Sequence, residues 1–138
     1  MLIQFKENNL GIKNDASVAD LLQFILRNES PIDRDKEHFW TIGLTTRNVV
    51  KYVDLTSLGT LNASLVHPRE VFRLAIMKGV ANIVIGHNHP SGNTEPSEED
   101  IRLTRRLIEA GKILGIEVLD HIIVAENNHL SFKATGLF

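Results

Sequence analysis

Two histidines and one aspartate are spaced so that they could bind one metal ion. His87 and His89 are two residues apart, Ser97 follows His89 after seven intervening residues, and Asp100 lies three positions further on. Two imidazoles and one carboxylate leave a fourth coordination position for water, which is the arrangement of a catalytic rather than a structural zinc site. The chain has no cysteine, so any zinc must be held by histidine and carboxylate groups.

Each part of this pattern also has a simpler explanation. An isolated His-x-His pair can be two histidines in a surface turn, and Ser97 with Asp100 has the spacing of a capping box at a helix start. The order of the segments favours the metal site. An apolar run over residues 81–86 leads directly into His87, turn residues follow at 90–93, and a helix then begins. The three side chains would meet where a strand ends and a helix starts, a common place for sites in α/β folds.

The elements that must position these residues have clear sequence signals. The apolar spacing predicts helices over residues 15–27, 68–78 and 98–114. Pro68 suits the first turn of the second helix, and Gly79 and Gly115 can end the second and third. Ser17 and Asp20 resemble a capping box in the first helix. The second helix carries apolar residues around most of its circumference, so we expect it to be largely buried.

Strands are predicted between and after these helices, with a turn at residues 46–48. The predicted strands cover residues 39–46, 49–55, 61–66, 81–86, 116–124 and 129–132. The strand–helix–strand succession predicts an α/β fold with a mixed sheet.

Length and composition limit the functional class. The chain has 138 residues, of which 43% are apolar, so it can form one domain with a real core. The formal net charge is −2, which gives no general attraction to nucleic acid. Acids and amides stand in the N-terminal segment where a signal peptide would be apolar, and no run approaches the length of a membrane span. We therefore expect a cytoplasmic protein.

The spacing His-x-His, seven residues, Ser-x-x-Asp matches the metal motif of the JAB/MPN/JAMM metalloproteases. More closely, residues 35–138 resemble the JAB domain of bacterial RadC-like proteins. The matching segments are GTLNASLVHPREVFRLA (59–75), GHNHPSG (86–92), EPSEED (95–100) and LDHIIV (119–124). The resemblance implies a cytidine-deaminase-like fold, a three-layer α/β/α sandwich with a mixed sheet. It also implies a zinc-dependent hydrolase, a metallopeptidase of JAMM type that acts on a protein or peptide.

The same resemblance assigns roles to individual residues. Its metal ligands fall on His87, His89 and Asp100, and the serine that helps to hold the transition state falls on Ser97. The family also uses a glutamate as general base at the start of an upstream strand. By that pattern the base is Glu37, with Glu70 as the rival.

Several positions keep an alternative interpretation. His67 is expected to be a turn or cap residue, and one member of the pair Asp120–His121 could support a metal ligand, although a structural hydrogen bond is the simpler role. Basic residues line one flank of the third helix, as a solvated face or as a docking surface for phosphates: Arg102, Arg105, Arg106 and Lys112.

Two alternative functions remain open at this stage. The chain could process or repair DNA with the same site, or it could be a non-catalytic interaction module of MPN type. The segment 1–34 is expected to be a helical extension packed on the domain at 35–138. That segment is too short for the helix-hairpin-helix region of longer RadC-like proteins, which weakens the link to DNA.

Overall fold

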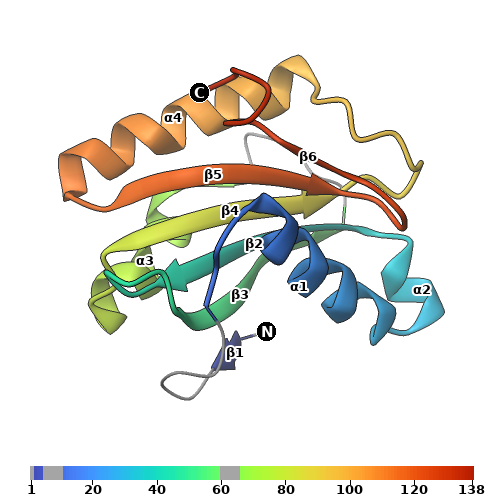
Figure 1. Ribbon diagram of the computed structural model, residues 1–138, viewed down its shortest axis with the longest axis horizontal. Helices are drawn as coiled ribbons and strands as arrows, with labels where there is room; N and C mark the ends of the chain where they lie inside the picture. Colours follow the sequence, from blue (N-terminus) through green and yellow to red (C-terminus); the bar gives the residue numbers. More distant parts are fainter. Residues whose placement is uncertain (1, 5–10, 60–65) are drawn as a thin grey trace.

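The computed structural model describes residues 2–4, 11–59 and 66–138. Figure 1 shows the elements of this part of the chain in their spatial arrangement. In chain order they are β1 (Leu2–Gln4), α1 (Asp15–Arg27), α2 (Pro31–Arg34), β2 (Glu37–Leu44), β3 (Val50–Gly59), α3 (Pro68–Lys78), β4 (Asn82–Asn88), α4 (Glu98–Leu114), β5 (Glu117–Val124) and β6 (His129–Ser131).

The strands form one mixed sheet in the order β1-β3-β2-β4-β5-β6. Only β4 and β5 pair in parallel among these neighbours, and each of the other adjacent pairs is antiparallel. Strand β4 lies between β2 and β5, which explains why its side chains are almost all buried. A site at the end of β4 is therefore supported by a strand that is held on both sides.

Helices cover both faces of this sheet and make three layers. Helix α1 packs Val18, Leu22 and Ile25 against one face, where Trp40 and Ile42 of β2 lie. Helices α3 and α4 cover the other face, with Phe72 and Leu107 in the core beneath them (Figure 1). The expected three-layer α/β/α sandwich with a mixed sheet is confirmed.

The three predicted helices have the observed bounds, because each one carries start and stop signals in the sequence. Gly79 and Gly115 end α3 and α4 with φ values of 66° and 72°, a left-handed conformation that glycine adopts without strain. The predicted capping box at Ser17 is wrong. Asn14 caps α1, with its side-chain oxygen accepting a hydrogen bond from the Ser17 amide.

Other differences concern short or exposed segments. Neither β1 nor α2 was expected, and both are too short to give a periodic signal. Helix α3 is less buried than predicted, since Ile76 is 58% exposed and Met77 is 74% exposed. The strand predicted over residues 61–66 lies outside the described residues except for Val66, which is buried but not in a strand.

The N-terminal segment packs on the sheet through α1 and also contributes β1 to its edge. The boundary that we placed between residues 34 and 35 stays a prediction. No helix in the described ranges combines the length and apolar character that a membrane crossing requires.

Candidate metal centre

The candidate ligands come together where β4 ends and α4 begins. His87 lies on β4 next to its last residue, and His89 follows directly after the strand. Asp100 is in the first turn of α4, where it forms a capping box with Ser97. Its side chain accepts from the Ser97 amide at 2.9 Å, and its own amide donates to the Ser97 hydroxyl at 3.1 Å. The helix start thus fixes the carboxylate in front of the strand end.

The three side chains are close enough to share one ion. The Nε2 atoms of His87 and His89 are 2.9 Å apart, and each lies 3.4 Å from an oxygen of Asp100. One ligand atom from each residue falls within 4.8 Å of the others. His87 is fully buried and Asp100 is 6% exposed. His87, His89 and Asp100 could therefore hold a metal ion.

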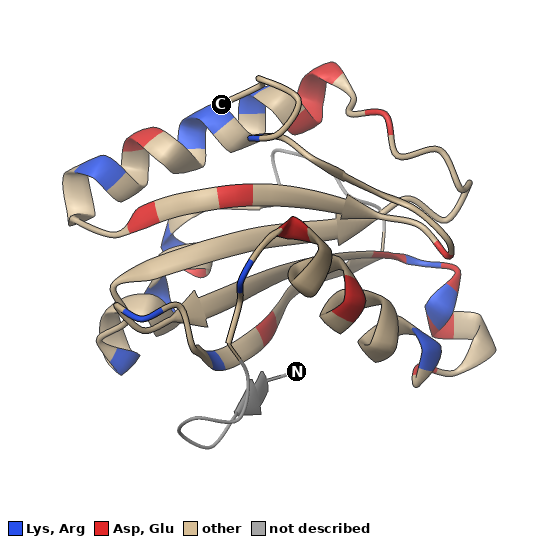
Figure 2. Cartoon of the chain, viewed as in Figure 1, with Lys and Arg blue, Asp and Glu red and all other residues tan. Residues whose placement is uncertain are grey.

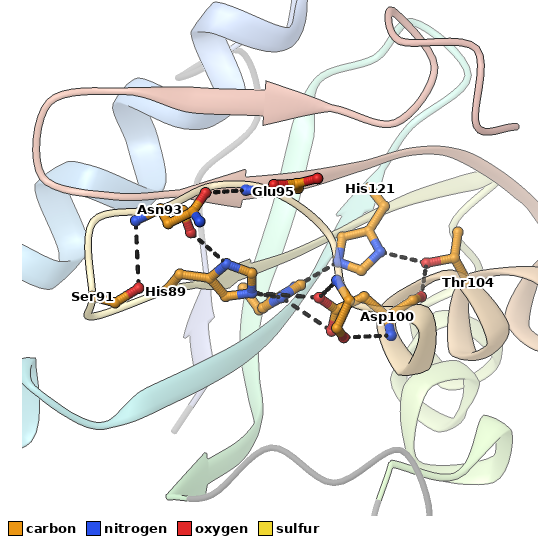
Figure 3. Close-up of polar contacts among 9 residues, drawn as sticks. His89, Ser91, Asn93, Glu95, Asp100, Thr104 and His121 are labelled. Carbon is orange, nitrogen blue, oxygen red and sulfur yellow. Dashed lines mark hydrogen bonds and ion pairs between the residues drawn. The ribbon is translucent and has the colours of Figure 1, made fainter.

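The loop after β4 orients the ring of His89. Its Nδ1 atom lies 2.7 Å from the carbonyl oxygen of Asn93 and can donate to it. Asn93 is in turn held by the Glu95 amide, which donates to its side-chain oxygen at 2.9 Å (Figure 3). A ring that donates through Nδ1 keeps the lone pair of Nε2 for a metal, which is the usual arrangement around metal-ligating histidines.

A second chain of hydrogen bonds orients His87. Figure 3 shows His121 beside Thr104. The Thr104 hydroxyl donates to the Asp100 carbonyl at 2.7 Å, so its oxygen can accept from Nδ1 of His121 at 2.5 Å. Nε2 of His121 then carries no proton and accepts from Nδ1 of His87 at 2.6 Å. This leaves Nε2 of His87 free to bind a metal.

Burial and close contacts set the charges around the site. Complete burial holds the pKa of His121 well below its usual range, so its ring is neutral. Burial opposes ionisation of Asp100, but the close approach of His87 and His89, each with Nε2 3.4 Å from a carboxylate oxygen, outweighs it and holds the pKa of the carboxyl well below its usual value. Contact with Asp100 raises the pKa of His89, and Glu37 adds to the same effect, so a metal would compete with a proton for this ring.

Glu37 opens onto the same cavity as His89. Phe39 of β2 pairs with His87 of β4 in antiparallel register, and side chains two residues apart on a strand share a face. Continued by two residues on each strand, this register places Glu37 opposite His89 on the same face. Both line an open cavity of about 820 Å³. The predicted base and one predicted ligand, His89, therefore face the same cavity.

The rival glutamate lies in a different environment. Glu70 is in the first turn of α3, with its carboxylate 3.7 Å from Arg73. His67 occupies the N-cap position of the same helix, but its side chain makes no capping hydrogen bond.

The basic flank of α4 has the pattern of a solvated helix face. Arg102 lies 3.3 Å from Glu98, and Lys112 lies 3.1 Å from Glu109, each within the same helix. Figure 2 shows the two signs of charge alternating along α4.

Three supporting residues were missed or ranked too low by sequence reasoning. His121 contacts His87, whereas its neighbour Asp120 accepts from the Ser131 hydroxyl and the Lys133 amide in a structural role. Thr104 follows Asp100 by one helical turn, a spacing that places both on one helix face. Asn88, between the two histidines, is 3% exposed and bonds to the backbone of Lys36 and His38 at the start of β2. A polar residue inside an apolar strand was the only sequence signal for His121.

Comparison with known proteins identifies the family. The sequence profile described as the RadC-like JAB domain matches residues 12–137. The chain is 47% identical over 136 residues to a UPF0758 protein of Moorella thermoacetica, covering 99% of this chain and 57% of that protein. It is 55% identical over 104 residues to a UPF0758 protein of Desulforudis audaxviator, covering 75% of this chain and 45% of that protein.

A third relative aligns over the whole chain. It is the UPF0758 protein of Caldanaerobacter subterraneus, 40% identical over 138 residues, which is 57% of that protein's length. The chain spans about half the length of the curated relatives it matches. The matched profile and these relatives, together with the α/β sheet and the His-His-Asp cluster, show that the chain belongs to the RadC-like JAB domain family.

Proposed function

We propose that this chain is a zinc-dependent hydrolase, a metallopeptidase that cleaves a peptide or isopeptide bond. The observation that carries the proposal is the convergence of three ligand atoms within 4.8 Å of one another, one of them from His89, which lines a cavity together with Glu37. Three protein ligands and one open position are typical of catalytic zinc. A carboxylate beside such a site can serve as the proton acceptor.

The donor set fits zinc. Two imidazole nitrogens and one carboxylate oxygen are ligands that zinc commonly takes, and the hydrogen bonds at both Nδ1 atoms leave the two Nε2 atoms available. Zinc bound by His87, His89 and Asp100 would supply a water of lowered pKa and would polarise the substrate carbonyl.

The residues of the chain would supply the remaining functions. Glu37 would accept a proton from the attacking water and return it to the leaving amine. The Ser97 hydroxyl stands at the start of α4, beside Asp100, where it could donate to the oxygen on which charge develops. The neutral ring of His121 would keep His87 in one orientation.

Metal content is the first test. Protein purified without chelators should contain about one zinc ion per chain, and His87→Ala or Asp100→Ala should lose it, because each removes one of only three protein ligands. Elemental analysis of the wild-type protein and both variants makes the measurement. A wild-type protein that binds no zinc, even after zinc is added, would contradict the proposal.

Hydrolysis is the second test, with Glu37 and Glu70 compared as a matched pair. Glu37→Gln keeps the size of the side chain and removes the proton acceptor, so it should lower kcat by roughly two to four orders of magnitude while zinc stays bound. Glu70→Gln should leave kcat close to wild type. A quenched-fluorescent peptide library serves as the probe. A large loss in Glu70→Gln and none in Glu37→Gln would reverse the assignment.

A further inference from the structure

The middle residue of the sequence His87-Asn88-His89 contacts the segment that carries Glu37. Side chains alternate along β4, so Asn88 points away from the face of the two histidines. It lies on the α1 side of the sheet, where it lines a cavity with Gln23 of that helix. Its side-chain nitrogen Nδ2 donates to the Lys36 carbonyl at 3.0 Å, and its side-chain oxygen Oδ1 accepts from the backbone amide of His38 at 2.5 Å.

These two bonds hold the backbone on both sides of Glu37. The Lys36 carbonyl also lies 2.8 Å from Nδ1 of His38, a fully buried ring that stacks on Trp40. The paired register of β2 and β4 extends to Phe39 and His87. Asn88 therefore continues the connection between the two strands past that pair, up to the position of Glu37.

This geometry has a direct consequence for the site. His87 and His89 precede and follow Asn88 in the chain, while Lys36 and His38 precede and follow Glu37. One buried amide side chain thus joins the centre of the ligand motif to the backbone of the proton acceptor. A base must lie within hydrogen-bond reach of the proton it takes, and a displacement of about 1 Å can cost 100-fold in rate.

We propose that Asn88 is a positioning residue, which fixes Glu37 relative to His87 and His89 by bonding the backbone of Lys36 and His38. The inference rests on the proposed function, because it takes Glu37 as the general base. It assigns to Asn88 no contact with the substrate or the metal.

The first experiment is a double-mutant cycle on the zinc-loaded protein with the peptide library as the probe. Asn88→Ala should lower kcat tenfold or more, leave KM within about twofold and keep the zinc content, because the ligands remain. In the background of Glu37→Gln the same change should have little further effect, since no base remains to be positioned. If Asn88→Ala instead caused a general loss of packing, its fold-loss in kcat would multiply with that of Glu37→Gln.

Thr41→Val is the matched control. Thr41 is also on β2, is 1% exposed, and its hydroxyl forms a hydrogen bond with the hydroxyl of Thr56 at 2.8 Å. It makes none of the contacts that hold Lys36 or His38. It should leave kcat near the wild-type value. A kcat in Asn88→Ala equal to that of the wild type, or a loss that multiplies fully with Glu37→Gln, would overturn the inference.

The second experiment needs neither metal nor substrate. Amide exchange measured by NMR in the metal-free protein should be faster at His38 in Asn88→Ala than in the wild type, and unchanged there in Thr41→Val. If Asn88→Ala does not fold, Asn88→Asp replaces it. That variant keeps the acceptor for the His38 amide and loses the donor to Lys36, so His38 should stay protected while kcat falls below the wild-type value. A wild-type kcat in Asn88→Asp would then overturn the inference.

These experiments distinguish the positioning role of Asn88 from the proposed function. If the wild-type protein binds zinc but cleaves no peptide of the library, the proposed function fails. The amide exchange rates still test whether Asn88 holds the backbone at His38. Equal His38 exchange in the wild type and in Asn88→Ala would overturn the positioning role whatever the enzymatic result.

Discussion

At the scale of single residues, the orientation of each candidate ligand is set by a group outside the ligand set. A backbone carbonyl accepts a hydrogen bond from His89, whereas the orientation of His87 depends on the side chains of His121 and Thr104. A hydrogen bond to a backbone carbonyl is kept in any variant that keeps the loop conformation. A hydrogen bond to a side chain is lost when that side chain is replaced. The ligand most sensitive to changes outside the motif should therefore be His87.

Substitution of His121 or Thr104 should weaken zinc binding without removing a ligand. Thr104→Val and His121→Phe break the chain of hydrogen bonds that fixes the His87 tautomer, and changes of this kind typically cost 10- to 100-fold in metal affinity. Competition with a chromophoric chelator measures the affinity. Asp120→Asn is the control, because Asp120 bonds to Ser131 and Lys133 instead. Equal affinity in all of these proteins would show that His121 has only a structural role.

The candidate ligands could be predicted from the sequence because they lie in one short motif. Glu37 lies fifty positions before His87, and only the family resemblance pointed to it. Thr104 and Asn88 could not be found in this way, since their roles depend on contacts that exist only after the sheet and α4 have assembled.

At the scale of elements, α4 links stability to the site through its first turn. Ser97 and Asp100 cap the helix reciprocally, and both residues have predicted roles in catalysis or metal binding.

The long helices could be predicted because start and stop residues bound each of them. The strand β1 could not, because three residues form a strand only by pairing with β3. The helix α2 was missed although Ser30 caps it and Pro31 opens it, because four residues are too few for a periodic signal.

Three substitutions at Ser97 should separate its capping role from a role in the reaction. Ser97→Ala should lower the free energy of unfolding by about 0.5–2 kcal/mol, whereas Ser97→Gly should cost only a few tenths, because glycine is tolerated at an N-cap. Both remove the hydroxyl, so both should lower kcat equally if it stabilises the transition state. Ser97→Thr retains a hydroxyl and serves as the control. Denaturant unfolding measures the stability and peptide cleavage measures kcat. An unchanged kcat in Ser97→Ala and Ser97→Gly would show that Ser97 only caps the helix.

At the scale of the whole molecule, a metal at this site would join two parts of the fold. His87 belongs to β4, whose Val84 packs in the core under α1 and whose Ile85 packs in the core under α3 and α4. Asp100 belongs to α4. An ion held by these residues would connect the central strand to an outer layer. Its binding energy should therefore appear as stability of the complete domain rather than of one loop.

Zinc should raise the melting temperature of the metal-free protein in proportion to the logarithm of its concentration. A ligand at 100 times its Kd stabilises the native state by about 2.7 kcal/mol, which corresponds to a shift of the order of 10 °C for a domain of this size. Asp100→Asn should lose the shift because the neutral amide is a poor zinc ligand. Glu37→Gln should keep it, since the base does not hold the ion. Thermal unfolding of the three proteins across a zinc series measures the effect. A shift of equal size in Asp100→Asn would mean that zinc stabilises the fold from a different site.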